Sequence, residues 1–168
     1  MNKKKLTAAV AGAAVAGILS AGQAQANVPA FAAPFVDPGC LCGGLLPAPI
    51  EVGVDADQFP VQHYLDGNFS AANPDAAAEV RYFTAPTGAI SILELGDMAD
   101  DVFGSVTYGS YRGHPSFTTA VAENDHGVYL QSTVLVAGSR VIILTGSGYS
   151  AADAVGSLTT LSNTFLVL

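Results

Sequence analysis

Lysine is missing from almost the whole chain. The three lysines lie within the first five residues, and only three arginines, Arg81, Arg112 and Arg140, follow them. All 14 acidic residues lie beyond residue 26, so the chain after that point carries 11 more negative than positive charges. Affinity for nucleic acid begins with the neutralisation of phosphates by Lys and Arg, so nucleic acid is a poor partner. The same deficit disfavours electrostatic attachment to anionic lipid head groups.

The chain also lacks an apolar run long enough to span a bilayer, which takes about 20 residues. Its longest uncharged apolar stretch, from Leu6 to about Ser20, follows the lysines and leads to Ala24-Gln25-Ala26. A basic start, a short apolar segment and an Ala-x-Ala site are the three parts of a secretory signal peptide. The sequence therefore predicts that residues 1–26 are a signal peptide cleaved after Ala26, and that no membrane span follows it.

A lipid anchor would require a cysteine directly after the apolar run, where Gln23 stands instead. We therefore expect a protein that is secreted to the medium or the cell wall without a lipid anchor. The 142 residues that follow the signal suit a single domain. Their acidic excess is interpreted as a device for solubility.

Cysteine is scarce: Cys40 and Cys42, one residue apart, are the only two. Export implies oxidising surroundings, and an intramolecular Cys-x-Cys bridge closes a very small, strained and reducible ring. An intermolecular bridge, which would give a disulfide-linked dimer, a soft-metal site and two idle thiols are the alternatives. Two thiolates do not complete a zinc site, so we favour a strained or intermolecular disulfide over metal.

Residues 27–50 contain five prolines. Such a stretch cannot sustain a helix or a central strand. The sequence predicts an extended or disordered leader here, with its apolar side chains packed back on a domain that spans residues 51–168.

The remainder reads mainly as strands followed by one helix. The expected strands cover residues 78–84, 89–95, 102–111, 116–122, 128–136 and 140–145, with a polar connection over 96–101. Apolar residues then recur at helical spacing from 151 to 163, behind Ser150 as the N-cap. This order predicts an α+β fold: an antiparallel sheet with flanking helices, the C-terminal helix packed on the sheet.

Three short motifs occur in a familiar order: Tyr111-Arg112-Gly113-His114-Pro115 before a strand, a Gly138-Ser139-Arg140 hairpin, and a helix that ends at Phe165-Leu166. Over roughly residues 59–168 the chain resembles the Mog1/PsbP-like group, which includes the LpqN-type exported proteins of mycobacteria and relatives. The resemblance implies an antiparallel sheet flanked by helices. It also implies a binding role toward partner proteins, photosystem subunits or envelope glycolipids, with no catalytic residues to carry over. The missing lipobox cysteine departs from the LpqN-type pattern.

Two residue groups are candidate sites. Tyr and His both ligate haem iron, and Tyr108, Tyr111 and His114 lie close together in sequence. Calcium takes carboxylate oxygens, which the connection supplies at Glu94, Asp97, Asp100 and Asp101. Ordinary strand aromatics beside a loop histidine, and a solvated acidic loop, are the alternative interpretations.

A small secreted hydrolase is the rival function, with Ser147 or Ser150 beside a histidine. The chain has no G-x-S-x-G elbow. Its G-x-G-x-x-A turn at 146–151 lacks the following parallel strand and acidic residue of a dinucleotide site. The leading prediction is therefore an exported, non-enzymatic binding or adaptor protein of the bacterial envelope. It has no cofactor, and its ligand is an envelope lipid or a protein partner.

Overall fold

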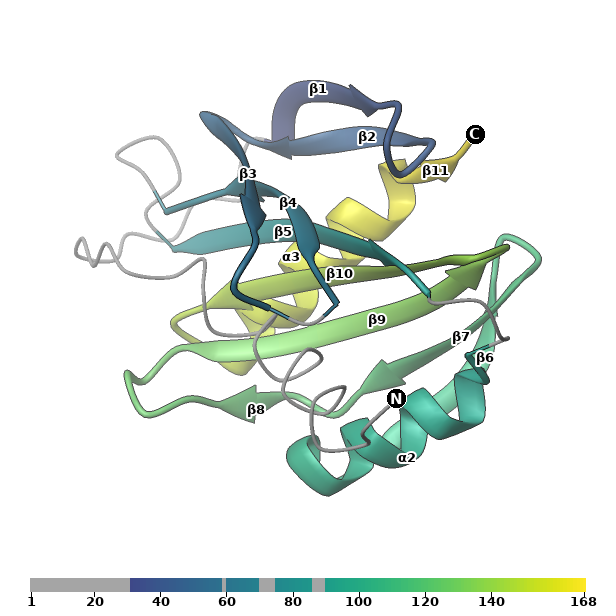
Figure 1. Cartoon of the computed structure of the whole chain (residues 1–168). Coiled ribbons are helices and arrows are strands. Elements are labelled where there is room, and N and C mark those ends of the chain that lie inside the picture. The colour runs from purple at the N-terminus through teal and green to yellow at the C-terminus, as the bar shows by residue number, and fades with distance from the viewer. Residues whose placement is uncertain (1–30, 59, 70–74, 86–89) are drawn as a thin grey trace.

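The computed structural model describes residues 31–58, 60–69, 75–85 and 90–168 (Figure 1). The predicted signal peptide and the first residues of the predicted leader lie outside these described residues. The strands are β1 (Phe31–Asp37), β2 (Cys42–Pro47), β3 (Ile50–Asp55), β4 (Gln62–Gly67), β5 (Ala76–Thr84), β6 (Val106–Tyr111), β7 (His114–Thr119), β8 (Ala122–Glu123), β9 (Tyr129–Ala137), β10 (Arg140–Gly148) and β11 (Leu166–Val167). The helices are α2 (Ile92–Phe103) and α3 (Ala151–Thr164).

The strands form two antiparallel sheets. The larger sheet has the order β3-β4-β5-β10-β9-β7-β6, with β8 paired to β9, and the smaller has the order β1-β2-β11. Helix α3 and the small sheet lie on one face of the large sheet, whereas α2 packs on the other face (Figure 1). The predicted α+β class with an antiparallel sheet is therefore confirmed.

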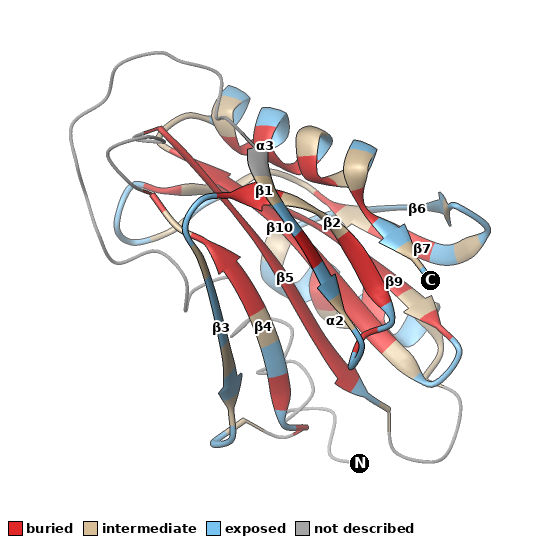
Figure 2. Cartoon of the chain, turned by 90° about the horizontal axis from the view of Figure 1, so that it is seen from above, coloured by how far each residue is buried: buried red, intermediate tan, exposed pale blue. Residues whose placement is uncertain are grey.

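The centre of the large sheet is the pair β5 and β10. They align along their whole length, from Arg140 opposite Thr84 to Gly148 opposite Ala76. Side chains of both strands are buried on both faces, which suits the β-branched run at the start of β10 (Figure 2). This rigid centre positions the elements packed on each side.

Helix α3 begins where the sequence predicts. The Ser150 hydroxyl accepts a hydrogen bond from the Asp153 amide at 3.2 Å and donates one to the Asp153 carboxylate at 2.6 Å. Because this N-cap satisfies a backbone donor at the helix end, it fixes the start of the helix. Ala154, Leu158 and Leu161 then form the buried stripe.

The small sheet differs from the predicted leader. Phe35, Leu46 and the two cysteines belong to the same core cluster as Leu158 of α3. The prolines do not prevent this arrangement. Pro34 lies in the edge strand β1 and Pro38 in the turn, and Pro47 is the last residue of β2, beyond the part of β2 that pairs with β11. Residues 31–47 are therefore part of the folded body.

Helix α2 corrects two sequence predictions: the strand over 89–95 and the polar connection over 96–101. The Ser91 side chain caps the helix by accepting from the Leu93 amide at 3.2 Å. Leu95 and Ala99, four residues apart, bury one face of the helix against the large sheet. The seven residues 89–95 taken alone are rich in Ile and Leu and favour a strand, whereas the helical period of the apolar residues is visible only when the acidic stretch 96–101 is included.

The predicted strand over 102–111 is correspondingly too long. Val102 and Phe103 end α2, and Gly104 follows as its C-cap with a φ of 81°, a conformation that glycine adopts without a steric cost. The strand begins only at Val106.

Candidate binding surface

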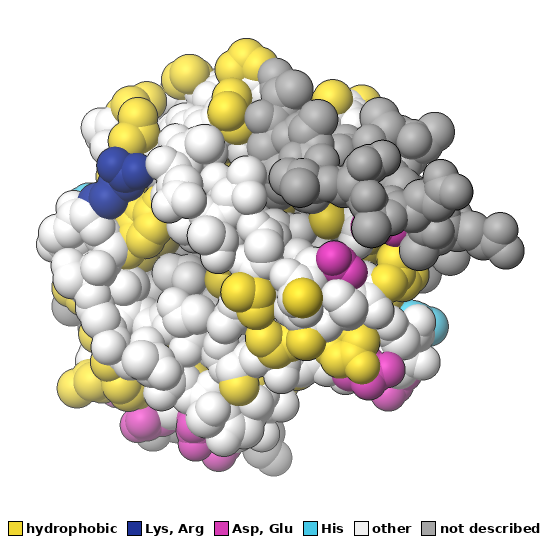
Figure 3. All heavy atoms as spheres, turned by 180° about the vertical axis from the view of Figure 1, so that it is seen from behind, with side chains coloured by type: hydrophobic (Ala, Val, Ile, Leu, Met, Phe, Trp, Pro, Cys, Tyr) yellow, Lys and Arg dark blue, Asp and Glu magenta, His cyan; other side chains and the backbone are white. Residues whose placement is uncertain are grey.

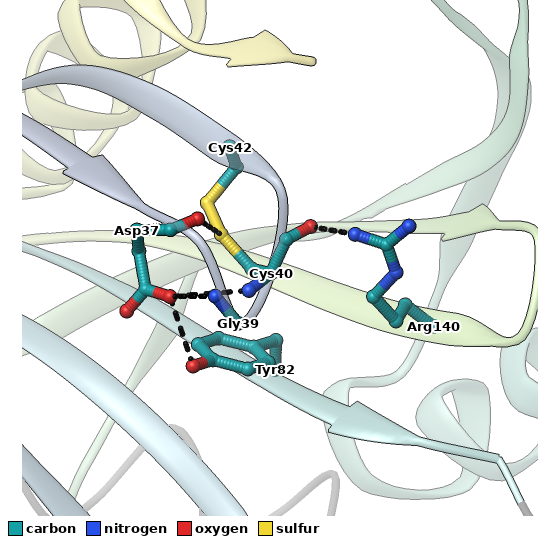
Figure 4. Close-up of a disulfide and its surroundings, with 6 residues drawn as sticks. All are labelled: Asp37, Gly39, Cys40, Cys42, Tyr82 and Arg140. Carbon is teal, nitrogen blue, oxygen red and sulfur yellow. Dashed lines mark hydrogen bonds between the residues drawn. A yellow bond between two sulfur atoms is a disulfide. The ribbon is translucent and has the colours of Figure 1, made fainter.

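The disulfide joins Cys40 and Cys42 of one chain, with 5.2 Å between their Cα atoms, at the turn from β1 to β2. One Asp37 carboxylate oxygen accepts three hydrogen bonds: from the Gly39 amide at 2.6 Å, the Cys40 amide at 3.1 Å and the Tyr82 hydroxyl at 3.1 Å (Figure 4). A guanidinium nitrogen of Arg140 donates to the Cys40 carbonyl on the other side. The turn is therefore fixed from several directions to the centre of the large sheet.

Leu41 is the residue between the two cysteines. Its φ is 51°, in the left-handed region, which costs an L-residue about 1–2 kcal/mol. Its side chain is 43% exposed although the cysteines beside it are fully buried. The Leu41 carbonyl also accepts from the Leu168 amide at 2.7 Å, which ties the end of the chain to this turn. The structure thus presents an apolar side chain at a position that glycine would occupy without strain.

Three further exposed apolar side chains lie near Leu41: Val36, Leu166 and Leu168. Val36 and Leu166 flank Gly43 on the two neighbouring strands, because β2 pairs with β1 and β11 in this register. We call the four exposed large side chains here the apolar face: Val36 at 74% exposure, Leu41, Leu166 at 45% and Leu168 at 65%.

Charge is nearly absent from this part of the molecule. Within residues 31–47 the only charged residue is Asp37, and its carboxylate is engaged in the turn. In the view from behind, hydrophobic side chains line the upper rim and also occur lower down, a Lys or Arg side chain lies at the upper left, and the Asp and Glu side chains lie below the rim (Figure 3). The apolar face therefore consists of four uncharged side chains on a strongly acidic protein, and two basic side chains, Arg112 and Arg140, contact backbone segments beside it.

All three arginines have structural contacts. Arg140 holds the Cys40 carbonyl. Arg112 donates to the Asn163 carbonyl at 3.1 Å and lies over the Tyr111 ring at 5.9 Å. Both therefore brace backbone segments next to the apolar face, whereas Arg81 is buried elsewhere.

The Arg81 guanidinium lies on the opposite face of the large sheet, among carboxylates. It forms ion pairs with Glu79 and Asp55 and stacks over the Tyr64 ring at 5.1 Å from its centroid. Asp66 is directly opposite Glu79 in the register of β4 and β5. Both carboxyl groups of that pair belong to buried residues, so the buried carboxyl groups outnumber the one buried cation, Arg81.

Burial raises the pKa of Glu79 to about 8, against the opposing effect of Arg81, and Asp66 adds to the rise. Burial likewise raises the pKa of Asp66 to about 7, again against Arg81, with a further contribution from Glu51. The cluster therefore takes up protons on folding near neutral pH.

This uptake predicts a pH dependence of stability. Carboxyl groups whose pKa is raised on folding stabilise the protein fully below their unfolded values, 3.8 for Asp and 4.5 for Glu. That contribution is lost as pH rises through about 7 and 8. We expect Tm to fall between pH 5 and pH 9 and to fall less in Asp66→Asn, as thermal unfolding followed by circular dichroism would show. Parallel pH profiles of the two proteins would contradict the assignment.

The structure separates the haem candidates. Tyr108 and Tyr111 lie on opposite faces of β6, since they are three positions apart and successive side chains of a strand point to alternate faces. The Tyr111 hydroxyl donates to the Phe165 carbonyl at 3.1 Å and to the Ser162 carbonyl, near the end of α3. The Tyr108 hydroxyl instead reaches the Leu93 carbonyl of α2 at 3.4 Å. Only Tyr111 and His114 are brought together, as a cross-strand pair.

The acidic candidates lie along α2 with their side chains exposed: Glu94, Asp97, Asp100 and Asp101. Within the described ranges, no group of three or more His, Cys, Asp or Glu side chains is placed to hold a metal ion. Ser150 is occupied as the N-cap of α3, and the Ser147 hydroxyl donates to the Ala77 carbonyl at 3.2 Å.

Sequence reasoning missed both the apolar face and the Arg81 cluster. The exposure of Leu41 follows from a backbone conformation that no sequence pattern states. A charged pair, Glu79 and Arg81, inside an expected strand was the available signal for the cluster.

None of the helices in the described part of the chain is long and apolar enough to cross a membrane. No protein-family model matches the chain, and neither does the sequence of any curated protein.

Several solved structures are similar to the chain. The solution structure of cyanobacterial PsbP (CyanoP) from Synechocystis matches at a TM-score of 0.54 with 14% identity, over 89% of this chain and 99% of that chain. A crystal structure from Bacteroides thetaiotaomicron matches at a TM-score of 0.47 with 12% identity, over 79% of this chain and 47% of that chain. The likeness to CyanoP shows the Mog1/PsbP-like fold that the sequence motifs predict.

Proposed function

We propose that the chain is an exported, non-enzymatic binding or adaptor protein of the bacterial envelope. It docks a partner lipid or protein through the apolar face. The one observation that carries this proposal is the uncharged, exposed set of Val36, Leu41, Leu166 and Leu168 on a chain with a large acidic excess.

The way in which Leu41 is held supports a binding role. A soluble protein gains nothing in stability from an exposed leucine in the left-handed region, which carries a local strain energy. Hydrogen bonds from Gly39, Cys40 and Tyr82 to Asp37 fix the turn before any partner arrives. A preformed apolar anchor loses little conformational entropy on binding, which favours affinity.

Export rests on the sequence alone: the basic start, the short apolar segment and the Ala-x-Ala site within residues 1–26. An extracytoplasmic location also suits a disulfide. The proposed location is the cell wall or the medium, with no lipid anchor.

Native mass spectrometry of the protein purified from its own culture medium or wall fraction tests the proposal. We expect a chain that begins at Asn27, together with a co-purifying lipid or protein mass. The variant Leu41→Gly combined with Leu168→Ser should reduce the bound fraction at least tenfold. Burying each leucine contributes about 1.5–3 kcal/mol, and 1.4 kcal/mol corresponds to a factor of ten.

Glycine at position 41 accepts the positive φ, so the double variant keeps the fold while it removes the side chain. Val155→Ser is the matched control, because Val155 is equally exposed, at 40%, on the outer side of α3. Docking through the apolar face would be ruled out if the double variant and Val155→Ser lost the bound mass equally. It would also be ruled out if the wild-type protein were found as a monomer with nothing bound.

A further inference from the structure

Strand β3 is an edge strand of the large sheet. It is a different surface from the apolar face, which lies on the small sheet. Its neighbour on one side is β4, and no described strand pairs with its other side. Figure 2 shows it as the outermost strand with largely exposed residues. Natural proteins usually protect such edges, because the unpaired backbone groups form a template for another strand.

On one side of β3 an apolar row runs off the edge of the sheet. Val52 lies opposite Leu65, which lies opposite Val80, which lies opposite Leu144. The last three side chains are buried in the core, whereas Val52 is 69% exposed. Val54, 52% exposed, lies on the same side of the strand. An added strand with apolar side chains on this side would therefore extend an existing core row.

On the other side of β3 an acidic row runs off the same edge. Glu51 lies opposite Asp66, which lies opposite Glu79. Asp55, two residues after Gly53, lies on the same side as Glu51. The row has one buried cation, Arg81, and ends with the exposed Glu51. A strand added at this edge meets two acidic side chains on this side, the exposed Glu51 and, four residues on, Asp55, which also pairs with Arg81.

We infer that β3 is a docking edge for an extended segment of a partner protein, one that alternates apolar residues with lysine or arginine. The apolar residues pack beside Val52 and Val54, and the basic ones face Glu51 and Asp55. Backbone hydrogen bonds supply affinity and the alternating side chains supply specificity. Like charges directly opposite each other on paired strands are unfavourable, so a second copy that pairs antiparallel through its own β3 is disfavoured.

A short synthetic peptide that alternates lysine and valine tests the inference, with a peptide that alternates glutamate and valine as its charge-reversed control. Both are titrated into the ¹⁵N-labelled mature protein while backbone amide shifts are followed. We expect the lysine peptide to shift the amides of residues 50–55, and the glutamate peptide to leave them unchanged. The substitution Glu51→Lys should lower the affinity for the lysine peptide at least fivefold.

Two controls separate this edge from the apolar face. Leu41→Gly should leave the peptide titration unchanged, so a failure of the proposed function does not affect this result. Val52→Thr keeps the β-branched shape and should weaken binding about threefold, whereas Val155→Thr on α3 should not. The inference would be overturned if both peptides bound equally or if the amide shifts were confined to other strands. It would also be overturned if the amides of residues 50–55 shifted because the protein dimerises with rising concentration.

Discussion

Replacing Arg81 with methionine is expected to lower the free energy of unfolding by about 3–5 kcal/mol at pH 8, because it leaves buried carboxylates without their cation. Arg81 is 2% exposed, and it pairs with Glu79, itself 6% exposed. Folded domains are stable by only about 5–15 kcal/mol, so the loss is a large fraction of the total stability. Urea unfolding of wild type and variant at the same pH measures the difference.

The loss should be smaller at pH 5. At pH 5 the carboxyl groups of Glu79 and Asp66 are below their raised pKa values of about 8 and 7, so both bind protons in the folded state with or without Arg81. A neutral carboxyl costs far less to bury than a charged one. Adding Glu79→Gln to Arg81→Met should recover part of the stability at pH 8 because it removes one of the unpaired charges. Arg112→Met, at an exposed arginine, is the matched control and should change little. A loss independent of pH, or no recovery in the double variant, would mean that packing and not charge explains the effect.

The part of the fold that the sequence predicted best is its C-terminal third. The run from Arg140 to Thr145 and the Ser150 cap are local signals, and the structure places a strand and a helix there. The Ala137–Ser139 turn likewise joins two strands that pair residue by residue. Where neighbouring residues specify a structure, sequence reasoning needs no knowledge of distant contacts.

The N-terminal hairpin was not predictable in this way. Its stability comes from distant partners: Arg140 on the Cys40 carbonyl, the pairing of Leu166 with Gly43, and Phe165 packed within reach of Gly44. The proline and glycine content of residues 31–47 is typical of an irregular segment. It carries no information about these distant partners. The sequence therefore predicted a leader packed back on the domain, whereas the structure forms two strands of the small sheet from residues 31–47.

The proposed binding role followed from a resemblance carried by three short motifs of the fold, and not from any catalytic or ligand-binding motif. The residues singled out as chemical candidates, such as Tyr111 and Ser150, turn out to hold hydrogen bonds that organise the fold. The two surfaces proposed here depend instead on exposure and on strand register. Neither quantity can be read from a single sequence, because both are set by which strands become neighbours.

Gly146→Val is expected to destabilise the protein by about 3 kcal/mol or more, at the upper end of the range for overpacked cores. Gly146 lies in β10 where α3 crosses the sheet. A Cβ atom there would lie 2.5 Å from the Ala154 carbonyl oxygen and 2.8 Å from the Leu158 Cα. Both are backbone atoms of the helix, so no side chain can move aside and the helix itself must shift.

Gly156→Ala is the matched control, because a Cβ on that exposed helical glycine meets nothing within 4 Å. It should stabilise the protein by about 0.5–1 kcal/mol, since alanine is the better helix former. Urea unfolding compares both variants with wild type. Because β11 directly follows α3, Gly146→Val should also displace Leu166 and weaken docking at the apolar face. A Gly146→Val protein with unchanged stability would mean that α3 does not pack on β10 as closely as the structure shows.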